Sequence, residues 1–150
     1  MGRITRYLAI MVLLVGVVSM VLGIVFVQQG FAQEDFLITA MEQEQITIDG
    51  IDGIVDSADK ALLAGNTVRE HRRGIAPTYG DLLGGERYNP TDLKQLSYAQ
   101  ALNLENYLYL AVASLGIFTV VKATGAFMII VGLALGGTGV VLLRLARKVS

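Results

Sequence analysis

Residues Tyr7 to Val27 read YLAIMVLLVGVVSMVLGIVFV, a run of 21 residues without a charged side chain. As an α-helix this run is about 30 Å long, which matches the hydrocarbon thickness of a bilayer. Its apolar residues surround the whole helix, so no face is suited to water. A chain of 150 residues rarely buries such a helix on every side. We therefore predict a transmembrane helix within residues 1–30, and expect an uncleaved anchor because the apolar region is longer than that of a signal peptide.

A second apolar stretch runs from Tyr107 to Leu143 and contains one charged residue, Lys122. Its 37 residues would form a helix of about 55 Å, which is more than one span requires. The segment Lys122–Gly125 adds a glycine, which destabilises helix interiors, to this charge. We predict a transmembrane helical hairpin in residues 104–150 that turns near 122–125. The alternative is a single long C-terminal helix that spans the membrane once.

The formal net charge of −1 conceals an uneven distribution. All 13 acidic residues lie between Glu34 and Glu105 with six basic residues, so this interval carries a net charge of −7. The remaining basic residues flank the apolar stretches: Arg3, Arg6, Lys122, Arg144, Arg147 and Lys148. Because basic flanks tend to stay in the cytoplasm, we predict a cytoplasmic N-terminus and an extracytoplasmic segment 31–103. Two spans would also keep the C-terminal basic residues in the cytoplasm, whereas three spans would export them.

The acidic segment 31–103 has the pattern of a small helical domain. Apolar spacing predicts a helix over 31–45 that continues the first span, followed by a looped stretch over 46–56 with Asp-Gly turns. A second helix is expected between Asp56, as its N-cap, and Gly74, as its C-terminal stop. After a glycine-rich loop over 78–88, a last helix is expected to start at Thr91 or Asp92 and to feed into the second apolar stretch.

Few residues in the chain have the spacing of a reactive site. His71 is the only histidine and cysteine is absent, which excludes a zinc site built on several histidines or thiolates. The aspartates at 49, 52, 56 and 59 do not have the spacing of an EF-hand calcium loop. No nucleophile elbow or phosphate-binding glycine motif is present. We predict no enzymatic activity, catalytic residue, cofactor or metal site, and the negative charge of the exported segment opposes binding to nucleic acid.

Two sets of residues are candidates for contacts. Small residues share one face of each apolar stretch, where they let helices approach closely: Gly16, Ser19 and Gly23 in the first, and Gly125, Gly132, Gly136 and Gly139 in the second. A basic patch of Arg69, His71, Arg72 and Arg73 stands near the end of the second predicted helix. The patch could bind an acidic partner, but we expect it to pair with the acidic residues of segment 34–59.

Three segments carry a resemblance to a family. They are His71–Asp81 (HRRGIAPTYGD), Tyr88–Pro90 (YNP) and Ala101–Ile117 (ALNLENYLYLAVASLGI). In this order they resemble small integral membrane proteins of actinobacterial type and uncharacterised function, some of which carry the label aromatic ring-opening dioxygenase. Leu115 stands where that pattern has Phe. The resemblance implies an N-terminal span, an exported segment and an apolar C-terminal pair, but one histidine gives the dioxygenase label no support, because non-haem iron sites use two histidines and a carboxylate.

Together these observations predict an all-α, multi-pass protein of the cell membrane that is not an enzyme. It would present a small acidic extracytoplasmic domain and act through protein–protein contacts. Its role would be that of an accessory, assembly or oligomer-forming protein, either as a homo-oligomer or as a subunit of a membrane complex. The alternative is an extracytoplasmic sensor that binds a cation or a small ligand.

Overall fold

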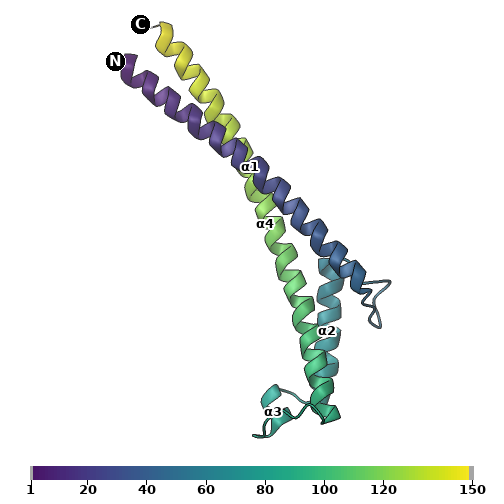
Figure 1. Cartoon of the computed structure of the whole chain (residues 1–150). Helices are drawn as coiled ribbons and strands as arrows, with labels where there is room; N and C mark the ends of the chain where they lie inside the picture. The colour runs from purple at the N-terminus through teal and green to yellow at the C-terminus, as the bar shows by residue number, and fades with distance from the viewer. Residues whose placement is uncertain (1, 149–150) are drawn as a thin grey trace. The chain divides into compact units, whose positions relative to one another are not determined.

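The computed structural model describes residues 2–148, with side chains from Ile4 to Lys148. This part of the chain forms four helices (Figure 1): α1 (Gly2–Glu44), α2 (Ala58–Ile75), α3 (Tyr79–Leu83) and α4 (Leu93–Lys148). It is 83% helical and holds no strand. Both α1 and α4 are long and apolar enough to cross a membrane, and only 11% of the most apolar window of each is buried. The predicted all-α membrane class is therefore confirmed.

The C-terminal region is one continuous helix of 56 residues, about 84 Å long. The predicted hairpin turn at 122–125 is wrong, because Lys122 to Gly125 are helical, and the alternative of a single long helix is the one observed. A lone glycine costs a helix about 1 kcal/mol, which is too little to break a long apolar helix. Gly125 instead lets α4 pack closely against α1, because a Cβ placed on it would lie 2.7 Å from the carbonyl oxygen of Gly23 in α1.

The chain forms two compact units, and both long helices contribute to each of them. The first, called here the helix pair, comprises residues 1–33 and 118–150, and the second, called the helical unit, comprises 34–117. Residues 104–117, predicted to lie in the membrane region, therefore pack within the helical unit. In the helix pair α1 and α4 run antiparallel, since Gly16 contacts Gly132 and Gly136 while Gly23 contacts Gly125. The N-terminal end of α1 and the C-terminal end of α4 lie at the same end of the pair (Figure 1).

The core of the helical unit lies between α2 and α4. Val55 and the α2 residues Ala61, Ala64 and Val68 pack with Leu108 and Ala111 of α4. As expected, α1 continues without a break to Glu44, and a loop with turns follows it. The backbone N–H of Val55 donates to the carbonyl of Ile46 at 3.0 Å, which closes this loop. The loop is thereby held against the core, and the partly buried side chains of Met41, Ile46 and Ile48 pack against the edge of that core.

The start of α2 differs from the prediction. The N-cap is Ser57, not Asp56. Asp56 pairs with Lys60 one turn later at 3.0 Å. The hydrogen bond from Lys60 lowers the pKa of the Asp56 carboxyl below its usual 3.8.

The end of α2 differs as well. The helix passes through Gly74 to Ile75, and Ala76 is extended with φ −155° and ψ 143°. A residue before proline favours an extended backbone, so Pro77 explains the stop better than Gly74.

The segment between α2 and α4 holds one short helix where a loop was expected. The Thr78 hydroxyl caps α3 by accepting from the N–H of Asp81 at 3.1 Å. The N-cap of α4 is Asp92, one of the two predicted residues, and its Oδ1 accepts from the N–H of Lys94 at 2.8 Å. Capping therefore fixes where α4 begins.

Candidate functional site

The first candidate feature is a seam of small residues in the helix pair. The buried residues among the described side chains of this pair are all small: Ala9, Gly16, Gly23 and Gly30 in α1, and Gly125, Gly132, Gly139 and Ala146 in α4. Each set repeats every seven residues. A seven-residue period keeps one face of a helix against its partner over many turns. These eight residues together form the seam.

The seam brings the two backbones into direct contact. A Cβ added to Gly16 would lie 2.5 Å from the backbone nitrogen of Gly136, and one added to Gly132 would lie 2.7 Å from the carbonyl oxygen of Gly16. A Cβ on Gly139 would lie 2.8 Å from the Cβ of Leu13. None of these positions has room for a side chain, so the packing requires glycine. Close approach of this kind replaces the hydrophobic drive that lipid does not supply.

The remaining predicted packing residues differ in role. The hydroxyl of Ser19 donates to the carbonyl oxygen of Met128 at 2.9 Å, which joins the two helices with a polar contact. Gly136 offers its backbone to Gly16, but its own Cβ position faces open space. Gly30 was not predicted, although a Cβ on it would lie 2.5 Å from Cγ of Lys122. The spacing of Gly16 and Gly23 continues to Gly30, so the seven-residue period could have identified it.

Lys122 packs beside Gly30, the last seam residue of α1. Its ammonium group lies 4.7 Å from the ring centroid of Phe31. Cations favour the face of an aromatic ring, and the long side chain of lysine lets its charge reach the edge of an apolar region. Lys122 therefore marks a contact in the helix pair, not a turn.

The second candidate feature is the basic patch, which the structure divides. Arg72 is buried between α2 and α4, with an exposed fraction of 8%, beside Glu105 at 6%. Its Nε donates to Glu105 Oε2 at 2.6 Å and its Nη2 donates to Oε1 at 3.3 Å. A third donor, Nη1, reaches the hydroxyl of the buried Tyr98. The hydrogen-bonded carboxylate of Glu105 raises the pKa of Arg72 above its ordinary value.

The other patch residues do not join this cluster. Arg69 donates to Asn66 Oδ1 at 3.0 Å, and its guanidinium lies 5.8 Å from the ring centroid of Tyr109. His71 and Arg73 are exposed on α2. The predicted pairing with segment 34–59 is wrong for Arg72, whose acidic partner is Glu105. The sequence gives no signal for that pair, because 33 residues separate the two side chains.

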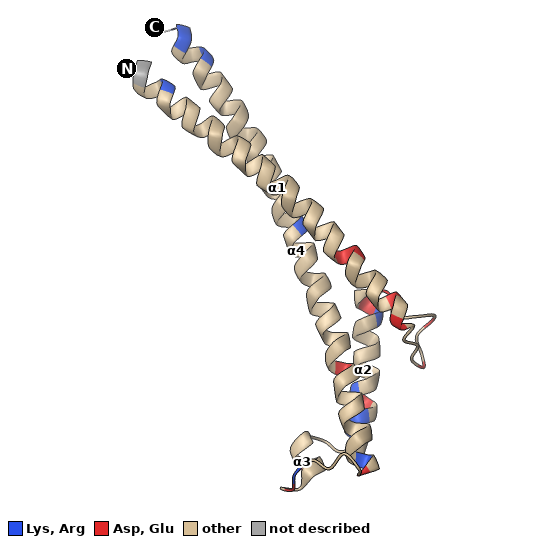
Figure 2. Ribbon diagram, viewed as in Figure 1, with Lys and Arg blue, Asp and Glu red and all other residues tan. Residues whose placement is uncertain are grey.

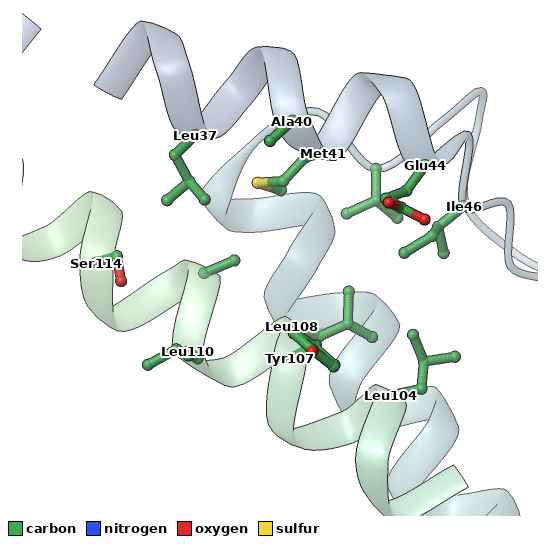
Figure 3. A pocket seen from close by; sticks show the side chains of 12 residues that line it. Leu37, Ala40, Met41, Glu44, Ile46, Leu104, Tyr107, Leu108, Leu110 and Ser114 are labelled. Carbon is green, nitrogen blue, oxygen red and sulfur yellow. The ribbon is translucent and has the colours of Figure 1, made fainter. Parts of the chain in front are cut away.

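The third candidate feature is an apolar groove in the helical unit, which sequence reasoning missed. It has a volume of about 550 Å³ and is lined by α1, the following loop and α4. Leu37, Met41 and Ile46 point into it from one side, and Leu104 and Leu108 lie across from them (Figure 3). Glu44 is its one charged lining residue among those described. A volume of this size is within the range of about 300–1,000 Å³ found for binding pockets.

Among residues 2–148, no three His, Asp or Glu side chains come together as metal ligands would. The aspartates of the loop after α1 are therefore not part of such a cluster in the described part of the chain, and the cation version of the sensor hypothesis gains no support. Comparison with protein-family models, curated proteins and solved structures finds no match to the chain. The resemblance carried by His71–Asp81 and Ala101–Ile117 stays a prediction.

Proposed function

We propose that the chain is a two-span membrane anchor that presents the helical unit outside the cytoplasm for contacts with other proteins. It has no enzymatic role in this proposal. The observation that carries it is the unbroken α4, paired antiparallel with α1 through the seam. Two helices that are apolar on their outer faces and packed together by glycine form a compact anchor with lipid around it.

The charge distribution supports this orientation. Arg6 stands at one end of α1, and Arg144, Arg147 and Lys148 stand at the end of α4, which is the same end of the helix pair (Figure 2). The side chain of Arg3 lies outside the described residues. With two spans, all these basic residues fall on the cytoplasmic side, as basic flanks prefer. Three spans would divide them, so the continuous helix and the charge distribution both support two spans.

The helical unit supports a role in protein contacts. The helical unit includes the interval Glu34–Glu105 with its net charge of −7, and its described residues hold an apolar groove instead of a reactive cluster. The buried polar groups of the unit pair within it, because Arg72 donates to both Glu105 and Tyr98. Surface charge together with an open apolar groove favours recognition of another molecule over catalysis.

A pair of reporter fusions tests the proposal. A reporter that is active only in the cytoplasm is placed after Ser150 or inserted at the exposed Gly85, and a reporter that is active only after export is placed at the same two positions. We expect cytoplasmic activity at Ser150 and exported activity at Gly85. Exported activity at Ser150 would contradict the two-span arrangement, and cytoplasmic activity at Gly85 would contradict the presentation of the helical unit outside the cell.

A further inference from the structure

The groove of the helical unit is apolar and its rim is open to solvent. Tyr107 and Leu110, which line it from α4, are 65% and 62% exposed. They belong to a stretch of α4, residues 106–121, that has no charged side chain. Exposed apolar patches beside a hollow mark binding surfaces, and tyrosine is enriched in protein interfaces. This exposed apolar face of an otherwise acidic unit is therefore a candidate binding surface.

The walls of the groove have the length of a short helix. On α4 the lining residues run from Leu104 to Ser114, and on α1 they run from Leu37 to Glu44. These segments are about 15 Å and about 10 Å long, which is two to three turns of an α-helix. Two helices that form the sides of an apolar groove can hold a third, which inserts side chains at positions i, i+3, i+4 and i+7.

The charges around the groove define the chemistry of its occupant. Glu44 lies at one end of the groove (Figure 3). Glu42 lies within the same wall segment of α1, Glu34 and Asp35 precede that segment, and residues 34–44 include no basic residue. On α4 no basic residue occurs between Lys94 and Lys122. The C-terminal end of α1 adds the negative pole of its helix dipole at the same place. This potential favours a cationic occupant and repels an anionic one.

We propose that the groove docks an amphipathic α-helix of a partner protein, whose apolar stripe is flanked by Lys or Arg. This inference rests on the proposed function, because it names the kind of partner that the helical unit meets. The apolar stripe covers Tyr107 and Leu110, and a basic flank lies near Glu44. Specificity comes from the acidic wall, and affinity comes from burial of the apolar stripe.

The test uses the full chain in nanodiscs of phosphatidylcholine, which has no net charge to attract a basic peptide. The probe is a fluorescent 18-residue peptide with Leu at i, i+3, i+4 and i+7 and Lys on both flanks. Two control peptides replace every Lys by Glu or scatter the Leu residues. We expect saturable binding of the Lys peptide, measured by anisotropy, and at least about tenfold weaker binding of either control. Equal binding of the Glu peptide would overturn the proposal.

Matched variants locate the binding. Ala40→Trp fills the groove and is expected to weaken binding by at least about tenfold, whereas Ala113→Trp, at an exposed α4 position outside the lining, leaves it unchanged. Glu44→Gln is expected to weaken binding about two- to fivefold, and Glu42→Gln, on the same helix outside the lining, has a smaller effect. Because Ala40→Trp could disturb folding, Leu110→Ala provides a second variant at an exposed position, with an expected loss of at least about threefold.

Other occupants give other results. If native mass measurement finds a dimer that Ala40→Trp dissociates, the groove holds a second copy and the proposal fails. If it finds a lipid that this variant releases, the groove holds an acyl chain and the proposal also fails. If the peptide does not bind while the reporter at Gly85 is exported, the proposed docking is wrong and the membrane topology stands. If that reporter is cytoplasmic, the proposed function itself is wrong.

Discussion

At the scale of single residues, Arg72 joins segments that lie far apart in the sequence. It bonds to Glu105 and Tyr98 from α4, and its guanidinium lies 4.9 Å from the ring centroid of Tyr98. No buried side-chain polar atom among the described residues lacks a hydrogen-bond partner. A buried ion pair adds little net stability when it is intact, but removing one partner leaves a charge without compensation. Arg72 and Glu105 therefore act as a constraint on how α2 docks against α4.

The change Arg72→Met tests this constraint. We expect it to lower the free energy of unfolding by about 3–5 kcal/mol, because Glu105 would remain buried without its partner. The double change Arg72→Met with Glu105→Leu is expected to recover most of the loss, since no buried charge then remains. Chemical unfolding followed by far-UV circular dichroism measures both. Equal losses in the single and double variants would show that shape, not charge, dominates at this position.

At the scale of elements, the length of α4 is the main finding. A charge and a glycine in an apolar run favoured a turn, yet the helix continues through both. Local propensity was outweighed by contact with α1, where Gly125 and Lys122 both have partners. The same residues that suggest a break in the sequence are those that touch the neighbouring helix.

A distance measurement checks the continuity of α4. The exposed residues Ala113 and Ala134 are each changed to Cys and spin-labelled, which is clean because the chain has no native cysteine. Their separation by 21 residues predicts a distance of about 32 Å between backbone positions in one helix. A hairpin that turns at 122–125 would bring the labels to about 10 Å, the spacing of packed helices. Pulsed electron–electron double resonance between the two labels distinguishes the long distance of a continuous helix from the short distance of a hairpin.

The seam is also a property of the elements, and a pair of glycine changes tests it. Gly23→Ala places a Cβ 2.6 Å from the carbonyl oxygen of Gly125, whereas a Cβ on Gly137 meets nothing within 4 Å. We expect Gly23→Ala to destabilise the helix pair by about 1–3 kcal/mol, because backbone cannot move aside without separating the helices. Gly137→Ala should leave stability unchanged or slightly raised. Unfolding in mixed micelles of increasing dodecyl sulfate content compares them; equal stability would argue against contact at Gly23.

At the scale of the whole molecule, charge is sorted along the chain. The basic ends of α1 and α4 belong to the helix pair, and all 13 acidic residues belong to the helical unit (Figure 2). In the proposed two-span arrangement both basic ends favour the same orientation, so each is expected to be a partial determinant of topology. We expect Arg3→Glu with Arg6→Glu to leave most molecules in the proposed orientation. Adding Arg144→Glu, Arg147→Glu and Lys148→Glu should produce a mixed or inverted population.

Labelling in intact cells measures that outcome. A single Cys replaces the exposed Asp52, and a maleimide that cannot cross membranes reports whether this position is outside. The unchanged chain and the two-residue variant should be labelled, and the five-residue variant should lose a large part of the signal. Complete inversion by the two N-terminal changes alone would mean that the C-terminal charges carry no orienting weight.

The sequence was sufficient for features that depend on short spacing. The long apolar N-terminal helix, the all-α class, the loop after residue 45 and the Asp92 cap follow from patterns within a few turns, and each is present. Contacts between segments that lie far apart in the sequence could not be predicted. The Arg72–Glu105 pair and the groove need the positions of segments far apart in the chain. The hairpin error has the same origin, because only the presence of α1 makes Gly125 a contact residue.

The regular spacing of the seam also has a consequence for specificity. Ala9, Gly16, Gly23 and Gly30 repeat with the same period as Gly125, Gly132, Gly139 and Ala146. A displacement of one helix along the other by seven residues, about 10.5 Å, would again set small residues against small residues. The seam thus fixes how near the helices come without encoding a unique alignment. That alignment is selected by contacts that do not repeat, namely Ser19 with Met128 and Lys122 with Phe31.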